Sequence, residues 1–119
     1  MDFKSVKECI NLTPHTVSFM VEDKVIRIPP SGKTARMVMQ STPHGTVAEI
    51  PVVKSTRGVI KGVPEPKEGV IYITSSVVAK ALRRDDVLAP DTTDTGVIRD
   101  GSGNIVAVKR LQCFDGESD

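Results

Sequence analysis

A period-two spacing of apolar residues along most of the sequence is the feature that most constrains this chain. Apolar side chains occupy every second position in the stretches "TVSFMV" (16–21) and "TARMVMQ" (34–40), and Ile10 and Leu12 alternate in the same way near the start of the chain. Successive side chains of a β-strand point to opposite faces, so this spacing indicates strands with one buried face. Proline, glycine, asparagine and aspartate recur between the stretches and mark turns. The chain is therefore expected to be rich in short strands.

One segment has helical spacing instead. Around residues 76–84, Val78 and Leu82 share one helix face, and Ser75 or Ser76 can cap the first N–H groups. With 119 residues, 39% of them hydrophobic and 26% charged, the chain can bury one modest core. The predicted fold class is α+β. We expect one compact β-rich domain over residues 1–119, built from antiparallel hairpins as a sheet or barrel, with a frayed acidic tail at 115–119.

The connections between strands follow from turn residues. The stretch "PPSGK" (29–33) is expected to join two strands of a hairpin, and "RDGSGN" (99–104) to be the turn of a C-terminal hairpin. The stretches "STPHGT" (41–46) and 55–69 are predicted as loops, because proline and glycine interrupt them. In the predicted strand "TARMVMQ" (34–40), Ala35, Met37 and Met39 are expected to face inward.

Composition excludes several classes of function. The formal net charge of +1 argues against a general duplex-DNA binder, so no sequence-specific nucleic-acid partner is expected. No apolar run is long enough to span a bilayer, which predicts no membrane partner. Cys9 and Cys113 lack metal-ligand spacing and are expected to be buried thiols outside disulfides.

Neither a metal nor a cofactor is expected. His15 and His44 lie in separate turn-like segments and do not complete a zinc site with the cysteines. The spacing of Asp91, Asp94 and Asp100 does not fit a calcium loop, and Asx turns explain these residues better.

The stretch Ser31-Gly32-Lys33-Thr34 matches the end of a nucleotide-binding phosphate loop. Such a loop also needs a glycine five positions before Gly32, where this chain has Arg27, and it must lead into a helix. The residues that follow alternate like a strand, so the phosphate-loop interpretation fails. Lys33 and Arg36 are either solvated charges or donors to a small anionic ligand.

Four blocks of sequence, "INLTPHTV", "IPPSGKTARM", "GVPEPKEGVIYITSSVVAKAL.RDDVLAPDT" and "VIRDGSGNIVAVKRLQ", are spread along nearly the whole chain, from residue 10 to residue 112. In this order they resemble a family of small proteins found in bacteriophages and prophages, with N-L-T-P-H, P-S-G-x-x-A-R, Y-I-x-S-S and R-D-x-x-G-N-I motifs. The resemblance implies a phage or prophage origin and an intracellular setting, the host cytoplasm.

Small phage proteins without catalytic motifs include sponges, which sequester the nucleotide signals of bacterial immunity. By analogy, we expect a non-enzymatic anti-defence protein that binds such a signal, for example a cyclic nucleotide, without cleaving it, as a homo-oligomer. The candidate ligand-binding residues are hydroxyl, basic and aromatic side chains in turns and at strand ends: Thr13, His15, Lys33, Arg36, Arg57, Tyr72, Ser75, Ser76 and Arg99.

Two alternatives remain open at this point. The protein could be a small phosphodiesterase or hydrolase that uses His15 or His44 as acid or base. It could also be a protein–protein interaction module or a minor phage structural protein, with exposed strand edges that pair with a partner.

Overall fold

The computed structural model describes residues 3–114, and these fold into strands, one 3-10 turn and one α-helix. In chain order the elements are η1 (Phe3–Ser5), β1 (Glu8–Asn11), β2 (Val17–Val21), β3 (Lys24–Ile28), β4 (Arg36–Val47), β5 (Ile50–Lys61), β6 (Val70–Ile73), α1 (Ser76–Leu82), β7 (Val87–Pro90), β8 (Val97–Arg99), β9 (Ile105–Val108) and β10 (Leu111–Cys113). The predicted β-rich α+β class with one helix is confirmed. The strands form open sheets, so the barrel alternative does not apply.

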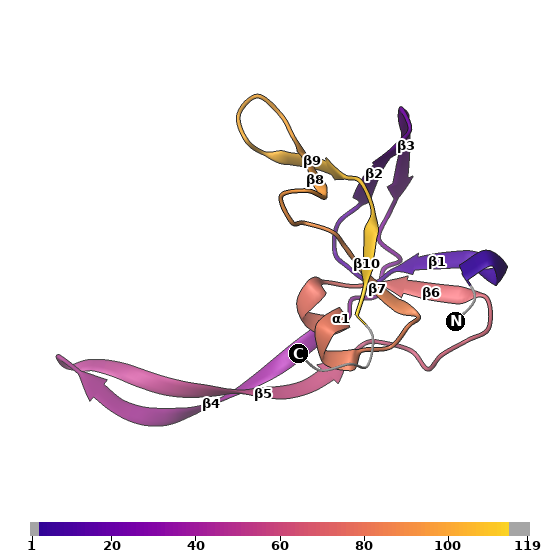
Figure 1. The fold of residues 1–119 in the computed structure, drawn as a ribbon. Coiled ribbons are helices and arrows are strands. Elements are labelled where there is room, and N and C mark those ends of the chain that lie inside the picture. Colours follow the sequence, from indigo (N-terminus) through magenta and orange to yellow (C-terminus); the bar gives the residue numbers. More distant parts are fainter. Residues whose placement is uncertain (1–2, 115–119) are drawn as a thin grey trace.

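A four-stranded sheet of order β1-β6-β7-β10 lies at the centre of the molecule (Figure 1). β1, β6 and β7 are parallel, and β10 is antiparallel to β7. All four residues of β6 are buried, as expected for a parallel strand covered on both faces. On one face, Val78 of α1 packs with Tyr72 of β6, and Ala79 packs with Val87 of β7. The antiparallel hairpins expected from the sequence do not describe this sheet.

A second four-stranded sheet, of order β3-β2-β9-β8, covers part of the opposite face of the first. Phe19 of β2 and Val108 of β9 pack against Ile73, which is fully buried. The C-terminal hairpin is confirmed in β8 and β9, where Asp100 Oδ1 accepts the backbone N–H groups of Ser102 and Asn104. The core of the protein therefore lies between the two sheets and beneath α1.

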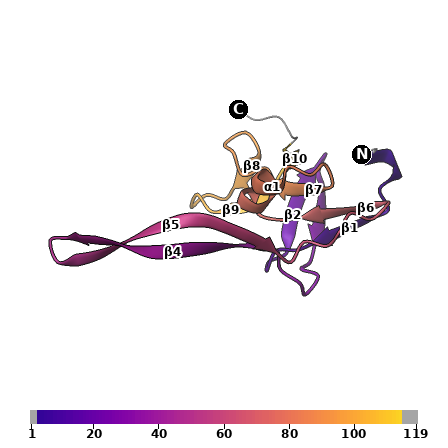
Figure 2. The same cartoon turned by 90° about the horizontal axis from the view of Figure 1, so that it is seen from below.

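The third sheet is a two-stranded ribbon of β4 and β5, called the arm below, which projects away from the rest of the molecule, the body (Figures 1 and 2). Each strand has 12 residues, and Ala48 and Glu49 form the turn with φ angles of 49° and 69°. The molecule measures 54 × 40 × 32 Å, and its radius of gyration is 17.1 Å. A compact domain of this length has a radius of about 13.5 Å. The projecting arm contributes to this larger radius.

Two stretches that were predicted as loops form strands of the arm. Residues 41–46 belong to β4 and residues 55–61 to β5, although both stretches contain turn-forming residues. A two-stranded ribbon consists only of edges, so it tolerates Pro43 and a bulge between Pro43 and Thr46. The arm also leaves Met39 about half exposed instead of inward-facing.

Two further expectations need correction. The stretch 29–33 joins β3 to β4, which do not pair, so it is a crossover between sheets and not the turn of a hairpin. Cys9 is half-buried on β1, where burial raises the pKa of its thiol to about 11. Cys113 is exposed on β10, and β6 and β7 lie between the two cysteines.

Candidate functional site

Asn11 organises the "NLTPHT" turn at the carboxyl end of β1. Its side chain is almost fully buried, and Nδ2 donates to the carbonyls of His15 (2.8 Å) and Ile28 (2.9 Å). Its Oδ1 accepts the backbone N–H of Thr13 at 2.9 Å. The Thr13 hydroxyl lies 2.7 Å from Asn11 Oδ1 and 3.0 Å from the His15 carbonyl, so it donates to one of them at a time. Local hydrogen bonds to the backbone thus fix this turn.

Two other segments are hydrogen-bonded to the same strand end. The loop before the arm runs beside it, because Ser31 N donates to the Asn11 carbonyl (2.9 Å) and Ala35 N to the Leu12 carbonyl (2.8 Å). From the other side, Leu12 N donates to the Ile73 carbonyl at 2.8 Å, at the end of β6. The carboxyl edge of the parallel strands therefore gathers three segments that are distant in sequence. In open sheets with parallel strands, ligands bind at this kind of edge.

The base of the arm brings cations to this edge. Arg36 and Lys61 are direct cross-strand partners, and both are exposed. A Cβ atom at Gly62 would meet the Thr34 carbonyl, so the segment that contains Lys33 runs close beside the end of β5. We call Lys33, Arg36 and Lys61 the basic cluster. Within residues 3–114, no ion pair joins any of the three to a carboxylate.

Like charges directly opposite each other in a sheet are destabilising. The Arg36–Lys61 pair therefore favours an anion that would offset their repulsion. The next cross-strand pair on the same face of the arm is Val38 and Val59, and these side chains are 36% and 61% exposed. The base of the arm thus places cations beside an exposed apolar surface.

Six of the nine predicted ligand-binding residues lie in the segments that meet at this edge: Thr13 and His15 in the turn after β1, Lys33 and Arg36 before and at the start of β4, and Ser75 and Ser76 after β6. The Ser75 hydroxyl is used as the helix cap, since it accepts the N–H of Val78 at 3.3 Å. Lys61 is not among the predicted residues. Only the pairing of β4 with β5 places it opposite Arg36, and no local sequence signal reveals that pairing.

The other three predicted residues lie elsewhere. Tyr72 is 2% exposed in the core, and its hydroxyl donates to the Glu65 carbonyl at 3.4 Å. Arg57 lies in β5, further along the arm than the basic cluster. Arg99 belongs to the β8–β9 hairpin, where Nη1 donates to the Gly103 carbonyl at 2.8 Å. Tyr72 and Arg99 therefore do not share a site with the basic cluster.

The two histidines are also apart. His15 is exposed beside a shallow groove of about 370 Å³, which Thr92 and residues 105–108 also line. His44 lies in the distal part of β4 on the arm. The two histidines therefore do not lie at one reaction centre.

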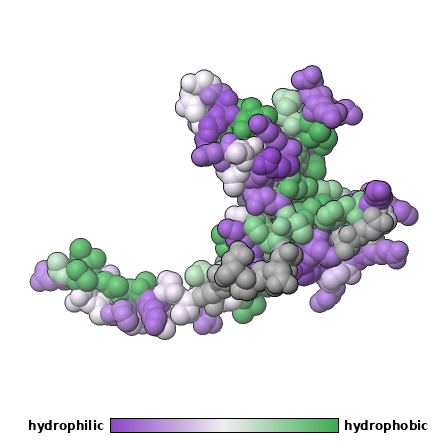
Figure 3. Space-filling model, in the orientation of Figure 1, coloured by the Kyte–Doolittle hydropathy of each residue, from purple (hydrophilic) through white to green (hydrophobic). Residues whose placement is uncertain are grey.

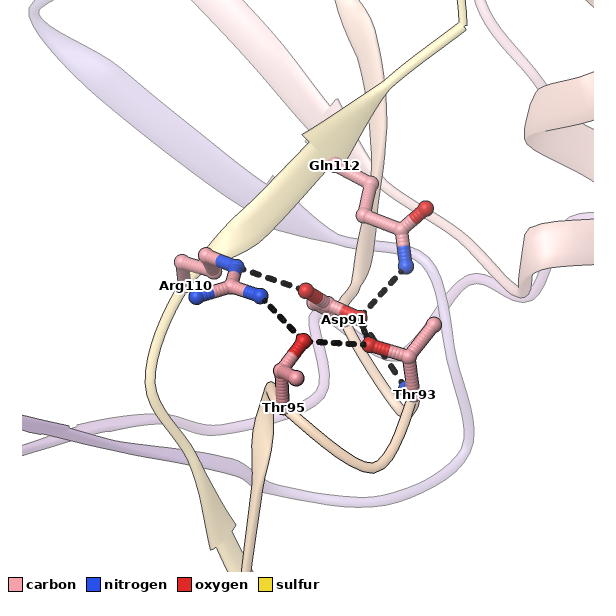
Figure 4. Close-up of polar contacts among 5 residues, drawn as sticks. All are labelled: Asp91, Thr93, Thr95, Arg110 and Gln112. Carbon is pink, nitrogen blue, oxygen red and sulfur yellow. Dashed lines mark hydrogen bonds and ion pairs between the residues drawn. The ribbon is translucent and has the colours of Figure 1, made fainter.

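A polar network around Asp91 joins β7 to β10 (Figure 4). Arg110 Nε donates to Asp91 Oδ2 at 2.6 Å, while Gln112 Nε2 and the Thr93 hydroxyl donate to Oδ1 at 2.8 and 2.6 Å. The Thr93 N–H also donates to Oδ1, which forms the predicted Asx turn. These hydrogen bonds, first of all that from the Thr93 hydroxyl, lower the pKa of Asp91 to about 2. Because Asp91 is fully engaged, it stabilises the fold and offers no base for catalysis.

Comparison of the chain with protein-family models, with curated proteins and with solved structures found no match, so only its own geometry bears on its function. Over residues 3–114, no three histidine, cysteine or acidic side chains gather closely enough to hold a metal ion. In the same part of the chain, no helix is long and apolar enough to cross a membrane.

Proposed function

We propose that this protein is a non-enzymatic binding protein that holds a small anionic, nucleotide-derived ligand at the basic cluster. One observation carries the proposal: the fold brings Lys33, Arg36 and Lys61 together at the carboxyl edge of parallel strands, with like charges directly opposite across the arm. Phosphate groups would relieve that repulsion and accept charge-assisted hydrogen bonds from the same side chains. The exposed Val38 and Val59 supply an apolar surface for a base or ribose.

The biological setting that we propose follows from the resemblance to phage proteins. In that setting, the ligand is a signal molecule of bacterial immunity, and the protein sequesters it in the host cytoplasm as an anti-defence sponge. Sequestration requires only that the ligand is held intact, so it needs cations and an apolar surface but no acid–base pair.

The geometry supports binding better than hydrolysis. A general acid or base needs a partner that orients it and a nucleophile within reach. His15 and His44 lie in separate parts of the molecule, and Asp91 is already saturated with hydrogen bonds. We therefore propose sequestration over the phosphodiesterase or hydrolase alternative.

Isothermal titration calorimetry with cyclic dinucleotides, cyclic trinucleotides and cyclic ADP-ribose isomers tests the proposal. We expect one of these ligands to bind, and the Arg36→Ala/Lys61→Ala double variant to bind at least about tenfold more weakly, because each charged hydrogen bond contributes about 1.5–3 kcal/mol. The matched control is Lys24→Ala, at an exposed position of β3 in the second sheet.

Two outcomes would contradict the proposal. The first is the absence of heat with every ligand at protein concentrations well above micromolar. The second is a double variant that binds as tightly as the wild type. Chromatography of the ligand released by heat separates binding from hydrolysis, because a sponge returns it unchanged. A ligand recovered in cleaved form, with turnover lost in His15→Ala, would favour the enzyme.

A further inference from the structure

The far end of the arm exposes large apolar side chains to solvent. Val47, Ile50 and Val53 are 65%, 64% and 58% exposed, and we call these three residues the arm tip. Figure 3 shows the apolar surface at this end of the arm. An isolated two-stranded hairpin is at best marginally stable in water and normally packs against a further strand or helix. In the body, the chain provides such support, but it provides none at the arm tip.

The arm is poorly suited to pairing through its edges. Pro43 in β4 and Pro51 in β5 lack the N–H groups that an added strand would need. Two register shifts interrupt the ladder as well, between Val38 and Gln40 and between Pro43 and Thr46. These features discourage edge-to-edge addition of another chain. The arm therefore offers the apolar side chains on its faces as the binding surface.

A matching hollow lies on the body. The second sheet covers only part of one face of the central sheet, and the uncovered part forms an apolar groove of about 360 Å³. The groove is lined by Phe3, Val6, Ile71, Leu88, Leu111 and Cys113. The arm extends away from the β1, β6 and β10 side of the body, so it does not fill the groove of its own chain (Figures 1 and 2).

We infer that the arm tip of one copy docks in the apolar groove of a second copy, and that two copies exchange their arms. Each chain carries one arm and one groove, so the exchange closes a symmetric dimer without leaving either surface exposed. Because the exchange is reciprocal, each copy contributes both an arm tip and a groove, and the dimer contains two such contacts.

Charge favours the same occupant. In the distal part of the arm, residues 41–57, the sequence has Lys54 and Arg57 against the single acidic residue Glu49, whereas Arg36 and Lys61 lie at the base of the arm. The hollow beside the groove is lined by three carboxylates and two cations, and the contact between Cys113 Sγ and the Asp85 carbonyl (3.9 Å) links this hollow to the groove. A basic arm is thus attracted to the groove side of a second body. This inference does not depend on the proposed ligand.

Sedimentation velocity of the full chain tests the dimer. The wild type should sediment as a dimer at micromolar concentration, and Val47→Ser/Ile50→Ser should shift the equilibrium to monomer, with at least tenfold weaker association. Val25→Ser/Ile26→Ser is the matched control, because it removes two exposed apolar side chains from β3 and should leave the dimer intact. Phe3→Ser, at the 52% exposed rim of the groove, should weaken association from the other side. A monomeric wild type, or a dimer that the arm-tip variant does not weaken, would overturn the inference.

A disulfide trap locates the contact independently of stability. In the Ile50→Cys variant, mild oxidation should link the arm of one chain to Cys113 of another, seen as a dimer on a non-reducing gel. The linkage should be lost in Ile50→Cys/Cys113→Ser. It should be weak in the control Thr42→Cys, which lies in β4 outside the arm tip. Equal linkage in Ile50→Cys/Cys113→Ser would show arm-to-arm contact and would contradict docking in the groove.

Discussion

The body and the arm use the same amino-acid types in opposite ways. In the body, β6 is buried along its whole length, and no buried side-chain nitrogen or oxygen among the described residues lacks a hydrogen-bond partner. In the arm, valine and isoleucine face solvent and like charges sit opposite each other. The body contains its own stabilising contacts, whereas the arm displays groups that a ligand or a second chain could satisfy. Differences between paired substitutions in the two regions therefore test this comparison.

The largest difference is expected between two isoleucines. Ile73→Ala removes a fully buried side chain between the two sheets and should lower the free energy of unfolding by about 2–5 kcal/mol. Ile50→Ala removes a side chain that is 64% exposed. In dilute monomer, this substitution should change the free energy of unfolding by less than about 0.5 kcal/mol. Urea denaturation of both variants measures the contrast. Equal losses would mean that the arm tip contributes as much to the stability of the fold as the core does.

The second prediction concerns acid stability of the body. Asp91 has a folded-state pKa of about 2 against an ordinary value of 3.8, so its contribution to stability is complete above about pH 4 and is lost as the pH falls towards 2. Asp91→Asn should lower stability at neutral pH and should flatten the stability curve between pH 4 and pH 2. Thermal melts over this range measure the slope. A variant with the same acid slope as the wild type would show that other carboxylates control acid unfolding.

The smallest effect is expected at the base of the arm. Lys61→Gln removes the repulsion across the strands from Arg36 and should raise the free energy of unfolding by about 0.2–1 kcal/mol, while it weakens ligand binding. Lys54→Gln is the matched control, because Lys54 pairs with the neutral Thr42 and should bring no gain. Chemical denaturation at low salt gives the best sensitivity, since salt screens exposed charges. A stability gain of equal size in both variants would rule out cross-strand repulsion as the cause.

Some site features were readable from sequence and others were not. The "NLTPHT" turn, the Ser75 cap and the Asp91 Asx turn all depend on side chains that bond to backbone within a few residues, so local patterns predict them. Lys61 escaped prediction because its partner Arg36 lies 25 positions earlier in the chain. Tyr72 was predicted as a ligand contact, yet the neighbouring strands and α1 enclose it in the core.

Local chemistry by itself determined the β-rich class, the helix with its cap, and the terminal hairpin, because alternation and capping act over a few residues. Tertiary structure alone decided that β1, β6 and β7 run parallel, since parallel pairing joins segments far apart in the chain. It likewise turned two stretches with loop-like sequences into the arm, where each strand supplies the hydrogen-bond partners of the other. The meeting of Lys33, Arg36 and Lys61 belongs to this second group, because contact between distant segments is set by how the sheets pack.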